Sequence, residues 1–545
     1  MMVNLKDLFL RRAKPAPLPT PAELDAAFLA KDFATAISLT RRLAESGDAA
    51  AQYRLGEVFE YGLGVLQDFA QALDHYEQAA EAGYADAWAK LGDFYLAGRG
   101  ARASEAPGGS ANRLLDMLSV RPDHDKALHW NRKAAEAGLA SGQAHLALHY
   151  IYGLGVEADR GEAESLLLTA ADKGSVIAQR CLGMLYAGGE GEPAHYDLAE
   201  HWFRAASNAG DAAACLALSL LIINGNATSG THQDAHRLLT KAADEDNVEA
   251  MLYLGSLYRD GLGTPKDLSA AETWFRRASV RGNRNATLSL GFLLTEAMEP
   301  RDYISGASVF REAAEQGDPV GQYVLGKLYL AGLGVPQDES KAAGWLRQAA
   351  DQDMMQALET LAALTAGGRG VERDAAKAIA LFERAAVEGS VDAPYHQAML
   401  MLEAGSDTPQ IIALLEDAAS RGSHAACIQL GIICAGRQDY ATAAIWYHKA
   451  TELGSTDGLF NLAFLRLRGL DPAPADARSG IALLEAAADG GHGPSLWALH
   501  NLYADGDYVA RDDAKARHWH ERAVAPTGAP ADQSAAQPEP ESLLQ

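Results

Sequence analysis

The amino-acid sequence predicts an all-α protein, a solenoid of stacked helix pairs, and three observations support this fold class. A short segment that ends in glycine, such as AAEAG, recurs along nearly the whole chain, and Gly83 follows Gly47 by 36 residues. Apolar residues between these glycines are spaced by three and four, which places them on one face of a helix. No stretch alternates apolar and polar residues as a half-buried strand does. A single compact core is not expected in a chain of 545 residues.

Residues 1–21 are predicted to form an N-terminal segment that ends in the proline-rich linker PAPLPTP. Apolar residues share one face of a short helix there, and basic residues follow them: Met2, Leu5, Leu8 and Phe9, then Arg11, Arg12 and Lys14. One interpretation is a docking peptide or a weak membrane-surface anchor, and the other is a tail without a function. The second is favoured because so short a helix is marginal in water. Lys6 and Asp7 argue against a signal peptide, since they interrupt the apolar stretch.

Residues 22–46 are predicted to be an N-terminal capping helix pair, because they end in RRLAESG much as the later helix pairs do. Residues 47–527 contain thirteen predicted repeats. We call the residue that bounds each repeat the marker. The markers are glycines except for Asp246, Asp353 and Thr527, and they stand at 47, 83, 138, 174, 210, 246, 282, 317, 353, 389, 422, 454, 491 and 527.

Each repeat is predicted to contain two helices. The first carries a small residue nine positions after the marker in every repeat except the last, which has His500: Gly56, Gly92, Ala147, Gly183, Ser219, Gly255, Gly291, Gly326, Ala362, Ala398, Gly431 and Ala463. A glycine-rich turn such as YGLGV follows in many repeats. The second helix opens at an aspartate: Asp68, Asp159, Asp267, Asp338, Asp374 and Asp512. Six of the eight tryptophans stand eight positions before a marker: Trp130, Trp202, Trp274, Trp345, Trp446 and Trp519.

This pattern has a direct physical interpretation. Glycine inside a helix costs about 1 kcal/mol relative to alanine, so its repeated use predicts a close approach of the partner helix. The alanine four positions before every later marker predicts a second tight contact, and the tryptophan or leucine is expected to fill the space between successive pairs. The marker suits the left-handed position that ends a helix, and the aspartate suits an N-cap. A single pair cannot bury both of its faces, so each pair is expected to depend on its neighbours.

The repeat resembles the Sel1-like repeats, relatives of tetratricopeptide repeats, over residues 47–527. Two repeats carry the first half of the motif A-x-x-x-L-G-x-x-Y-x-x-G-x-G-V well: Ala87, Leu91, Gly92, Tyr95, Gly98 and Gly100, then Val320, Leu325, Gly326, Tyr329, Gly332, Gly334 and Val335. The second half reads A-x-x-W-x-x-x-A-A-x-x-G. The resemblance implies a right-handed superhelix of antiparallel helix pairs. It also implies an adaptor or scaffold, including bacterial regulators of envelope, exopolysaccharide or secretion systems.

Several segments depart from the pattern. The repeats after Gly210, Gly282, Gly389 and Gly422 lack the GxGV turn, so a change of curvature is expected around residues 390–454. Residues 101–122 are a predicted insertion with a short helix at 111–120. The insertion either forms a loop on a binding face or results from length drift without function. The tail at 528–545 is rich in Ala, Pro, Gln and Glu and is expected to be disordered.

Composition limits the classes of partner. The net charge of −25 argues against nucleic acid, whose binding needs clustered Lys and Arg, and against broad adsorption to anionic membranes. Membrane association is expected only through the N-terminal segment. Four cysteines in 545 residues are no disulfide framework, and we expect reduced thiols and a cytoplasmic location.

Patterns that would indicate catalysis are weak. The GxG turns lack the lysine of a phosphate-binding loop and follow helices. The pairs His145/His149 and His232/His236 have helical spacing but lack the HExxH glutamate, so structural histidines are favoured over a metal site. We therefore predict that the chain is not an enzyme and has no catalytic, cofactor or metal site.

The predicted function is a scaffold that binds other proteins or peptides on its solenoid surface. Trp88, on a first helix beside the insertion, and Arg99, two residues before it, are the candidate binding residues, although a packing role for Trp88 is favoured. Two alternatives remain open. One is a membrane-associated regulatory subunit docked through residues 1–14, and the other is a polysaccharide-handling or hydrolytic protein.

Overall fold

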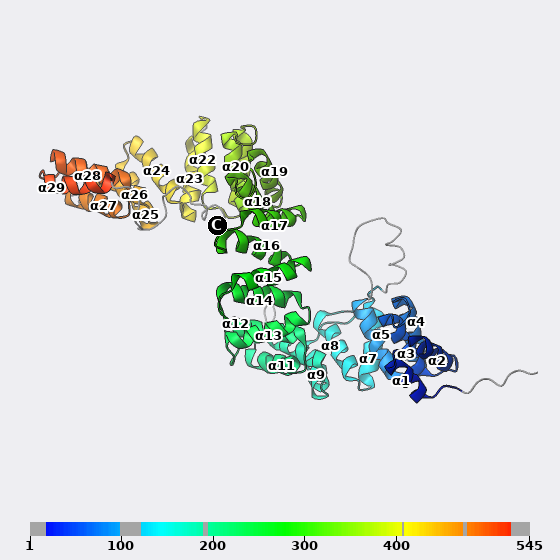
Figure 1. Cartoon of the computed structure of the whole chain (residues 1–545). Coiled ribbons are helices and arrows are strands. Elements are labelled where there is room, and N and C mark those ends of the chain that lie inside the picture. The colour runs from blue at the N-terminus through cyan, green and yellow to red at the C-terminus, as the bar shows by residue number, and fades with distance from the viewer. Residues whose placement is uncertain (1–17, 99–120, 189–193, 406–407, 472–476, 525–545) are drawn as a thin grey trace, which may run out of the picture. The chain divides into compact units, whose positions relative to one another are not determined.

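The computed structural model describes residues 18–98, 121–188, 194–405, 408–471 and 477–524, which contain helices and loops but no strand. The predicted segment at 1–14, Arg99, the helix at 111–120 and the tail at 528–545 lie outside these ranges. The chain divides into two compact units, Met1–Asp267 and Leu268–Gln545 (Figure 1). None of the described helices is both long and apolar enough to cross a membrane.

The described helices of unit 1 follow one another in pairs along the chain. Their bounds are α1 (Pro21–Leu29), α2 (Phe33–Glu45), α3 (Ala49–Tyr61), α4 (Phe69–Glu81), α5 (Ala85–Ala97), α7 (His124–Glu136), α8 (Ala140–Tyr152), α9 (Arg160–Asp172), α10 (Val176–Tyr186), α11 (Tyr196–Asn208), α12 (Ala212–Ile223), α13 (His232–Asp244) and α14 (Val248–Asp260). Each packs against the next in chain order.

Unit 2 continues the same alternation, with one short π-helix, η1, at the end of a first helix. Its helices are α15 (Leu268–Val280), α16 (Arg284–Phe292), η1 (Leu293–Ala297), α17 (Tyr303–Glu315), α18 (Pro319–Ala331), α19 (Glu339–Ala350), α20 (Met355–Gly367), α21 (Ala375–Val387), α22 (Ala393–Glu403), α23 (Thr408–Arg421), α24 (His424–Gly436), α25 (Tyr440–Glu452), α26 (Thr456–Leu467), α27 (Ala477–Asp489), α28 (Gly493–Asp505) and α29 (Asp513–Val524). The all-α solenoid predicted from the sequence is confirmed.

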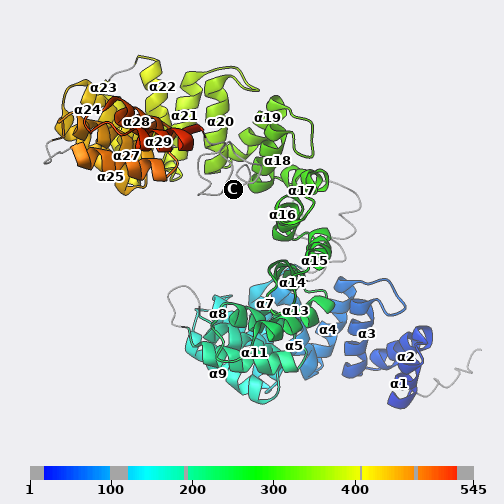
Figure 2. The same cartoon turned by 60° about the vertical axis from the view of Figure 1, so that its left-hand side comes forward.

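Successive first helices touch one another inside each unit, beyond their contacts with the second helices. The pairs in contact include α5 with α8, α8 with α10, and α10 with α12 in unit 1, and α24 with α26 in unit 2. Figure 2 shows how helices of unit 2, such as α15 to α18, follow one another in chain order. In these repeats the neighbouring first helices therefore lie side by side and share one surface. We call this surface the first-helix face.

The small residue nine positions after the marker lies against the second helix of its own repeat, as predicted. A Cβ atom on Gly56 would lie 2.5 Å from the Tyr76 ring, and one on Gly291 would lie 2.6 Å from the Phe310 ring. The side chain at this contact stands seven positions before the next marker, one residue after the tryptophan position, and the sequence analysis missed it. Tyr76, Phe275 and Phe310 are fully buried there, whereas Trp345 on α19 is half-buried.

The tight contact predicted at the alanine four positions before the marker is also confirmed. This alanine packs against a small residue on the next first helix, four positions after the marker. A Cβ atom on Gly321 would lie 2.7 Å from Ala313 Cβ, and one on Gly458 would lie 2.9 Å from Ala450 Cβ. Because each repeat is joined to the next through such contacts, the buried core runs along each unit without a single centre.

The helix ends also follow the sequence prediction. Marker glycines are left-handed, with φ of +86° at both Gly83 and Gly317, and the aspartates at 246 and 353 adopt the same region with φ of 62° and 55°. Asp68 and Asp338 cap second helices by accepting backbone N–H groups, those of Gln71 and Lys341. The change of curvature around 390–454 stays a prediction.

Candidate functional site

The first-helix face consists of positions that the packing of the repeats leaves uncovered. Residues three, six, seven and ten positions after the marker share one side of a first helix, because this spacing matches the helical repeat. On α24 these are Ala425, Ile428, Gln429 and Ile432, none of which is buried. Ile432 keeps 47% of its surface exposed. Large side chains therefore face solvent in a row along α24.

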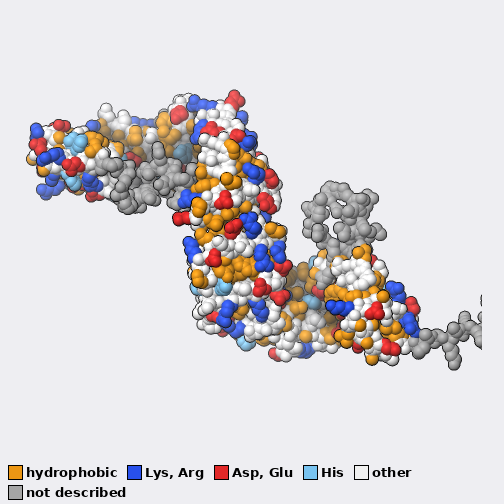
Figure 3. Space-filling view, in the orientation of Figure 1, with side chains coloured by type: hydrophobic (Ala, Val, Ile, Leu, Met, Phe, Trp, Pro, Cys, Tyr) orange, Lys and Arg blue, Asp and Glu red, His pale blue; other side chains and the backbone are white. Residues whose placement is uncertain are grey.

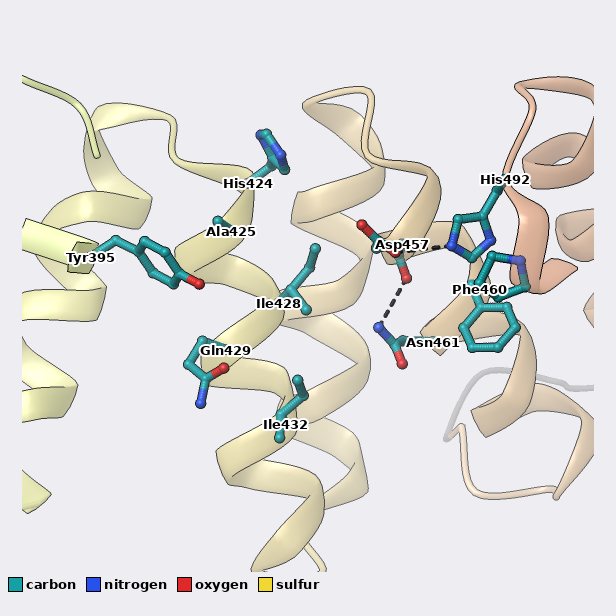
Figure 4. A pocket seen from close by; sticks show the side chains of 11 residues that line it. Tyr395, His424, Ala425, Ile428, Gln429, Ile432, Asp457, Phe460, Asn461 and His492 are labelled. Carbon is teal, nitrogen blue, oxygen red and sulfur yellow. Dashed lines mark hydrogen bonds and ion pairs between the residues drawn. The ribbon is translucent and has the colours of Figure 1, made fainter. Parts of the chain in front are cut away.

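Within unit 2 this face is hollowed into a groove of about 410 Å³ over α22, α24, α26 and α28 (Figure 4). Its lining residues come from four successive first helices and their starts, and most stand three, six or seven positions after the marker: Tyr395, His424, Ala425, Ile428, Gln429, Ile432, Asp457, Phe460, Asn461, His492 and Pro494. The repeats thus place the same part of each helix at one concave surface, and the groove crosses the helices from repeat to repeat.

Six of the eleven lining residues of the groove are apolar or aromatic. Tyr395 points from α22 toward α24, where Ile428 and Ile432 follow one another along the helix (Figure 4). The Phe460 ring on α26 packs edge-on against Phe464, with ring centroids 4.8 Å apart. Apolar groups of a bound segment would lose their contact with water here, which is the main favourable term in association.

The polar groups of the groove are clustered on α26 and at the start of α28. His492 Nε2 lies 2.9 Å from Asp457 Oδ1, and His492 Nδ1 lies 2.7 Å from Ser495 Oγ. Asn461 Nδ2 donates to the Asp457 backbone carbonyl at 3.0 Å (Figure 4). The His492 side chain is 10% exposed, whereas that of Asp457 is 62% exposed and keeps its carboxylate at the surface. No Lys or Arg lines the groove.

The first-helix face of unit 1 has a different character near α3 and α5, where charges neutralise one another. Glu60 is buried, and its carboxylate accepts the Tyr76 hydroxyl at 2.5 Å and pairs with Lys90 Nζ at 2.9 Å. Burial raises the pKa of the neighbouring Glu57 carboxyl, and Lys90 and Arg54 partly oppose that shift. These groups are engaged with one another, so this part of the face offers fewer free partners for a ligand than the groove of unit 2.

Trp88 lies in the packing between repeats. It stands five positions after its marker, and its indole Nε1 donates to the Ala80 carbonyl at 3.0 Å. Gln52 and Gln322 hold the same position in their repeats and donate to the equivalent carbonyls, those of Ala44 and Ala314. Trp88 is half-buried, and Lys133 Nζ lies 5.1 Å from its ring centroid. The structure thus gives Trp88 a packing contact, and its role in binding stays a prediction, as does that of Arg99.

The histidines of the two predicted pairs have different surroundings. His149 is buried, its Nδ1 lies 2.7 Å from the Leu154 carbonyl, and burial lowers its pKa. His236 packs edge-on against Tyr258, whereas His232 is exposed at the start of α13. Among the described residues, no group of three or more His, Cys, Asp and Glu side chains is arranged to hold a metal ion.

The GxG turns have a structural role between repeats. The second glycine of the turn lies against the start of the preceding second helix, and a Cβ atom on Gly334 would collide with the Tyr303 carbonyl and lie 2.9 Å from Ile304 N. Protein backbone therefore fills the space in front of this turn.

The groove was not found from the sequence. Its lining positions carry Tyr, Ile, Gln, Asn, Asp, Phe and His without a shared residue type, so no motif marks them. The signal that the sequence did contain is the helical spacing of three and four, counted from the marker on successive first helices.

Comparison with known proteins identifies the repeat. The model of the Sel1 repeat matches residues 49–84, 116–139, 140–175, 176–211, 248–283, 319–354, 361–390, 424–455, 456–492 and 496–525. The structure is similar to a protective antigen of uropathogenic Escherichia coli with an SLR fold, at 25% identity and a TM-score of 0.56, over 92% of this chain and 99% of that one. A Sel1 repeat protein from Oxalobacter formigenes matches at 29% identity, over 60% of this chain and 90% of its own, with a TM-score of 0.45.

Proposed function

The chain belongs to the Sel1 repeat family, and on this premise we propose that it is a scaffold that holds a segment of a partner protein in the groove over α22, α24, α26 and α28. Solenoids of this class are typically binding scaffolds without catalytic activity. The observation that carries the proposal is the row of large side chains that successive first helices present at one concave surface, namely Tyr395 on α22, Ile428 on α24 and Phe460 on α26. Tyr395 and Ile428 are only partly buried against the core of the repeats, so part of each side chain is left for a ligand.

The polar groups of the groove suit a peptide as the ligand. Gln429 and Asn461 both stand seven positions after their markers, on the successive first helices α24 and α26. A carboxamide donates through its nitrogen and accepts through its oxygen, as a peptide group does. An extended segment can therefore form main-chain hydrogen bonds at both positions while its side chains contact Tyr395, Ile428 and Phe460.

Site-specific crosslinking in the native host tests the position of the binding surface. A photo-crosslinking amino acid at position 429 or, in a second variant, at position 461 is expected to give a discrete adduct with a partner protein. The matched control is position 413, since Ala413 is exposed on the second helix α23 of the preceding repeat. Adducts that form equally at 413, or at neither 429 nor 461, would refute a binding role for the groove.

The cellular setting is part of the same proposal. We place the protein in the bacterial cytoplasm, as an adaptor in a regulatory system of the envelope, of exopolysaccharide or of secretion. The similar structure of an Escherichia coli protein supports a bacterial origin, and four free cysteines, three of them buried, accord with a reducing compartment. Cell fractionation of the full chain and of a chain without residues 1–14 tests the location. Retention at the membrane only when residues 1–14 are present would replace a cytoplasmic adaptor with a membrane-docked one.

A further inference from the structure

The electrostatic character of the groove narrows the kind of segment that it accepts. Its lining contains one carboxylate, two aromatic rings, two histidines and two carboxamides, and neither Lys nor Arg. An acidic segment would find no cationic partner among these side chains. A purely apolar segment would cover the Asp457–His492 pair without replacing its contact with water, which is unfavourable.

Three groove side chains on α26 are placed to receive a cation. Asp457, Phe460 and Asn461 are three and four residues apart, so they share one side of the helix, and Figure 4 shows them together at the groove. The Asp457 carboxylate lies in the first turn of α26, where the partial positive charge of the helix end favours it. A Lys or Arg side chain can bind the exposed carboxylate and lie against the Phe460 ring, whose face attracts cations.

The adjoining wall of the groove is apolar. Ile428 and Ile432 on α24 lie between Tyr395 of α22 and the groove residues of α26 (Figure 4). A bulky apolar side chain next to the cation would be buried between these three residues. The net charge of −25 adds a long-range attraction for cationic segments, which speeds association at low ionic strength.

We propose that the occupant of the groove is a partner segment in which Lys or Arg stands next to a bulky apolar residue. The cation binds Asp457 and the Phe460 ring, and the apolar side chain lies on Ile428, Ile432 and Tyr395. This inference rests on the proposed function, because it specifies the chemistry of the ligand in the same groove.

Selection of random peptides displayed on phage, with the full chain immobilised, tests this chemistry. The wild-type protein is expected to enrich peptides with Lys or Arg beside Leu, Ile, Phe, Trp or Tyr. Asp457→Lys is expected to lose that enrichment and to favour acidic peptides instead. The matched control is Asp417→Lys, which makes the same change of charge at an exposed site on the second helix α23 and is expected to leave the preference unchanged.

Binding of one selected cationic peptide then measures the effect directly. Fluorescence anisotropy is expected to show a loss of affinity of roughly tenfold or more for Asp457→Lys, and this loss shrinks as salt is added. Equal melting temperatures of the wild type and both variants establish that the fold is intact. Enrichment of acidic or uncharged peptides by the wild type would overturn the inference. So would an equal affinity of the wild type and Asp457→Lys for the selected cationic peptide.

A third variant separates this inference from the proposed function. Ile428→Asp places a charge in the apolar wall of the groove and is expected to abolish peptide binding. If Ile428→Asp abolishes binding while Asp457→Lys leaves the charge preference unchanged, the groove is the binding site and only its proposed cationic specificity is wrong. If Ile428→Asp has no effect, the groove is not the site, and both proposals fall.

Discussion

The loop between α18 and α19 and the loop between α12 and α13 make the same connection with different chemistry. Each joins the two helices of a repeat, and each is tied to the second helix of the preceding repeat. In unit 2, Gly334 brings the loop backbone against Tyr303, the first residue of α17. In unit 1, the carboxylate of Glu200 on α11 accepts the Thr228 N–H and hydroxyl, both at 2.6 Å, and the Ser229 hydroxyl at 2.5 Å.

The difference shows that the stacking of repeats fixes the connection but not the residues that make it. The Gly334 contact depends on the absence of a side chain and on a left-handed backbone, with φ of +68°. The Glu200 contact depends on a charge that is 4% exposed and is satisfied by hydrogen bonds from the loop and from Arg204. We therefore expect the two connections to fail under different changes of sequence and of pH.

The largest effect is expected from Gly334→Ala. The new Cβ would meet the backbone of Tyr303 and Ile304, which cannot move aside as a flexible side chain could, and alanine is strained at this φ. We expect a loss of about 3 kcal/mol in the stability of the α17–α19 region. Hydrogen exchange and urea unfolding of the full chain measure it.

The control is Gly317→Ala, where φ is +86° and nothing lies within 4 Å of the new Cβ. This variant carries the backbone strain alone and is expected to cost about 1 kcal/mol. Equal losses for the two variants would contradict the close approach of the loop to α17.

A smaller loss is expected from Glu200→Ala. Removal of the carboxylate leaves the Thr228 N–H and two hydroxyls without their acceptor, and hydrogen bonds to a charged group contribute about 2 kcal/mol in such sites. Hydrogen exchange is expected to rise in residues 224–231, the loop between α12 and α13.

Glu272→Ala provides the matched control. Glu272 pairs with Arg276 at 2.6 Å with the same i,i+4 spacing as the pair of Glu200 with Arg204. The Glu272 side chain is 29% exposed, against 6% for Glu200, and it accepts no hydrogen bond from a described loop. We expect a loss of about 0.5 kcal/mol or less for this variant. A comparable loss at both glutamates would assign the effect to the ion pair and not to the loop.

The pH dependence should distinguish the two connections further. Burial alone would raise the pKa of Glu200, but hydrogen bonds from Ser229 and Thr228 outweigh it and lower the pKa to about 2. The unfolded value is about 4.3, so the stabilisation is complete above that pH and is lost as the pH falls toward 2. The difference in unfolding free energy between the wild type and Glu200→Gln is expected to shrink by about 2 kcal/mol over this interval.

Glu200→Gln serves here because it removes only the ionisation at this position, and every other carboxyl group titrates in both proteins. The difference in stability between wild type and Gly334→Ala is expected to stay constant over the same interval, since no titratable group forms that contact. If the difference in unfolding free energy between the wild type and Glu200→Gln does not change with pH, Glu200 is not ionised in the folded protein.

The sequence was sufficient to predict the contacts that recur from repeat to repeat. It was insufficient to predict contacts that do not recur. The small residues at Gly56 and Gly291, the helix caps and the glycine turns recur at fixed spacing, so their packing roles followed from helix geometry. The contact between Glu200 and the loop does not recur at a fixed spacing, and the partners of Glu200 are 28 and 29 residues away in the sequence. No periodic signal therefore marked this contact.

The candidate site illustrates the same limit. Trp88 was selected because it lies on a first helix beside the insertion, outside the tryptophan position of the second helices. Gln52 and Gln322 hold the same position in their repeats and make the same hydrogen bond to a carbonyl. The groove depends on which side chains four successive helices bring together, and Ile428 and Phe460 look like ordinary apolar residues in the sequence. Residue types vary at a binding surface because the ligand, and not the repeat, determines them.

The smallest effect is expected at Tyr508. Tyr508 and Gly334 hold equivalent positions in their repeats, each seventeen residues after its marker. Tyr508 adopts φ of +64° although it is not glycine, and its side chain is 54% exposed. Tyr508→Gly should therefore relieve backbone strain and stabilise the α28–α29 region by up to about 1 kcal/mol, measured by urea unfolding and local hydrogen exchange. Tyr508→Ala keeps the strain and removes the ring, so it should give no gain. If both variants destabilise the region equally, the tyrosine ring contributes a contact that outweighs the strain, and this last connection would be held by a side chain, as the one at Glu200 is, and not by the backbone.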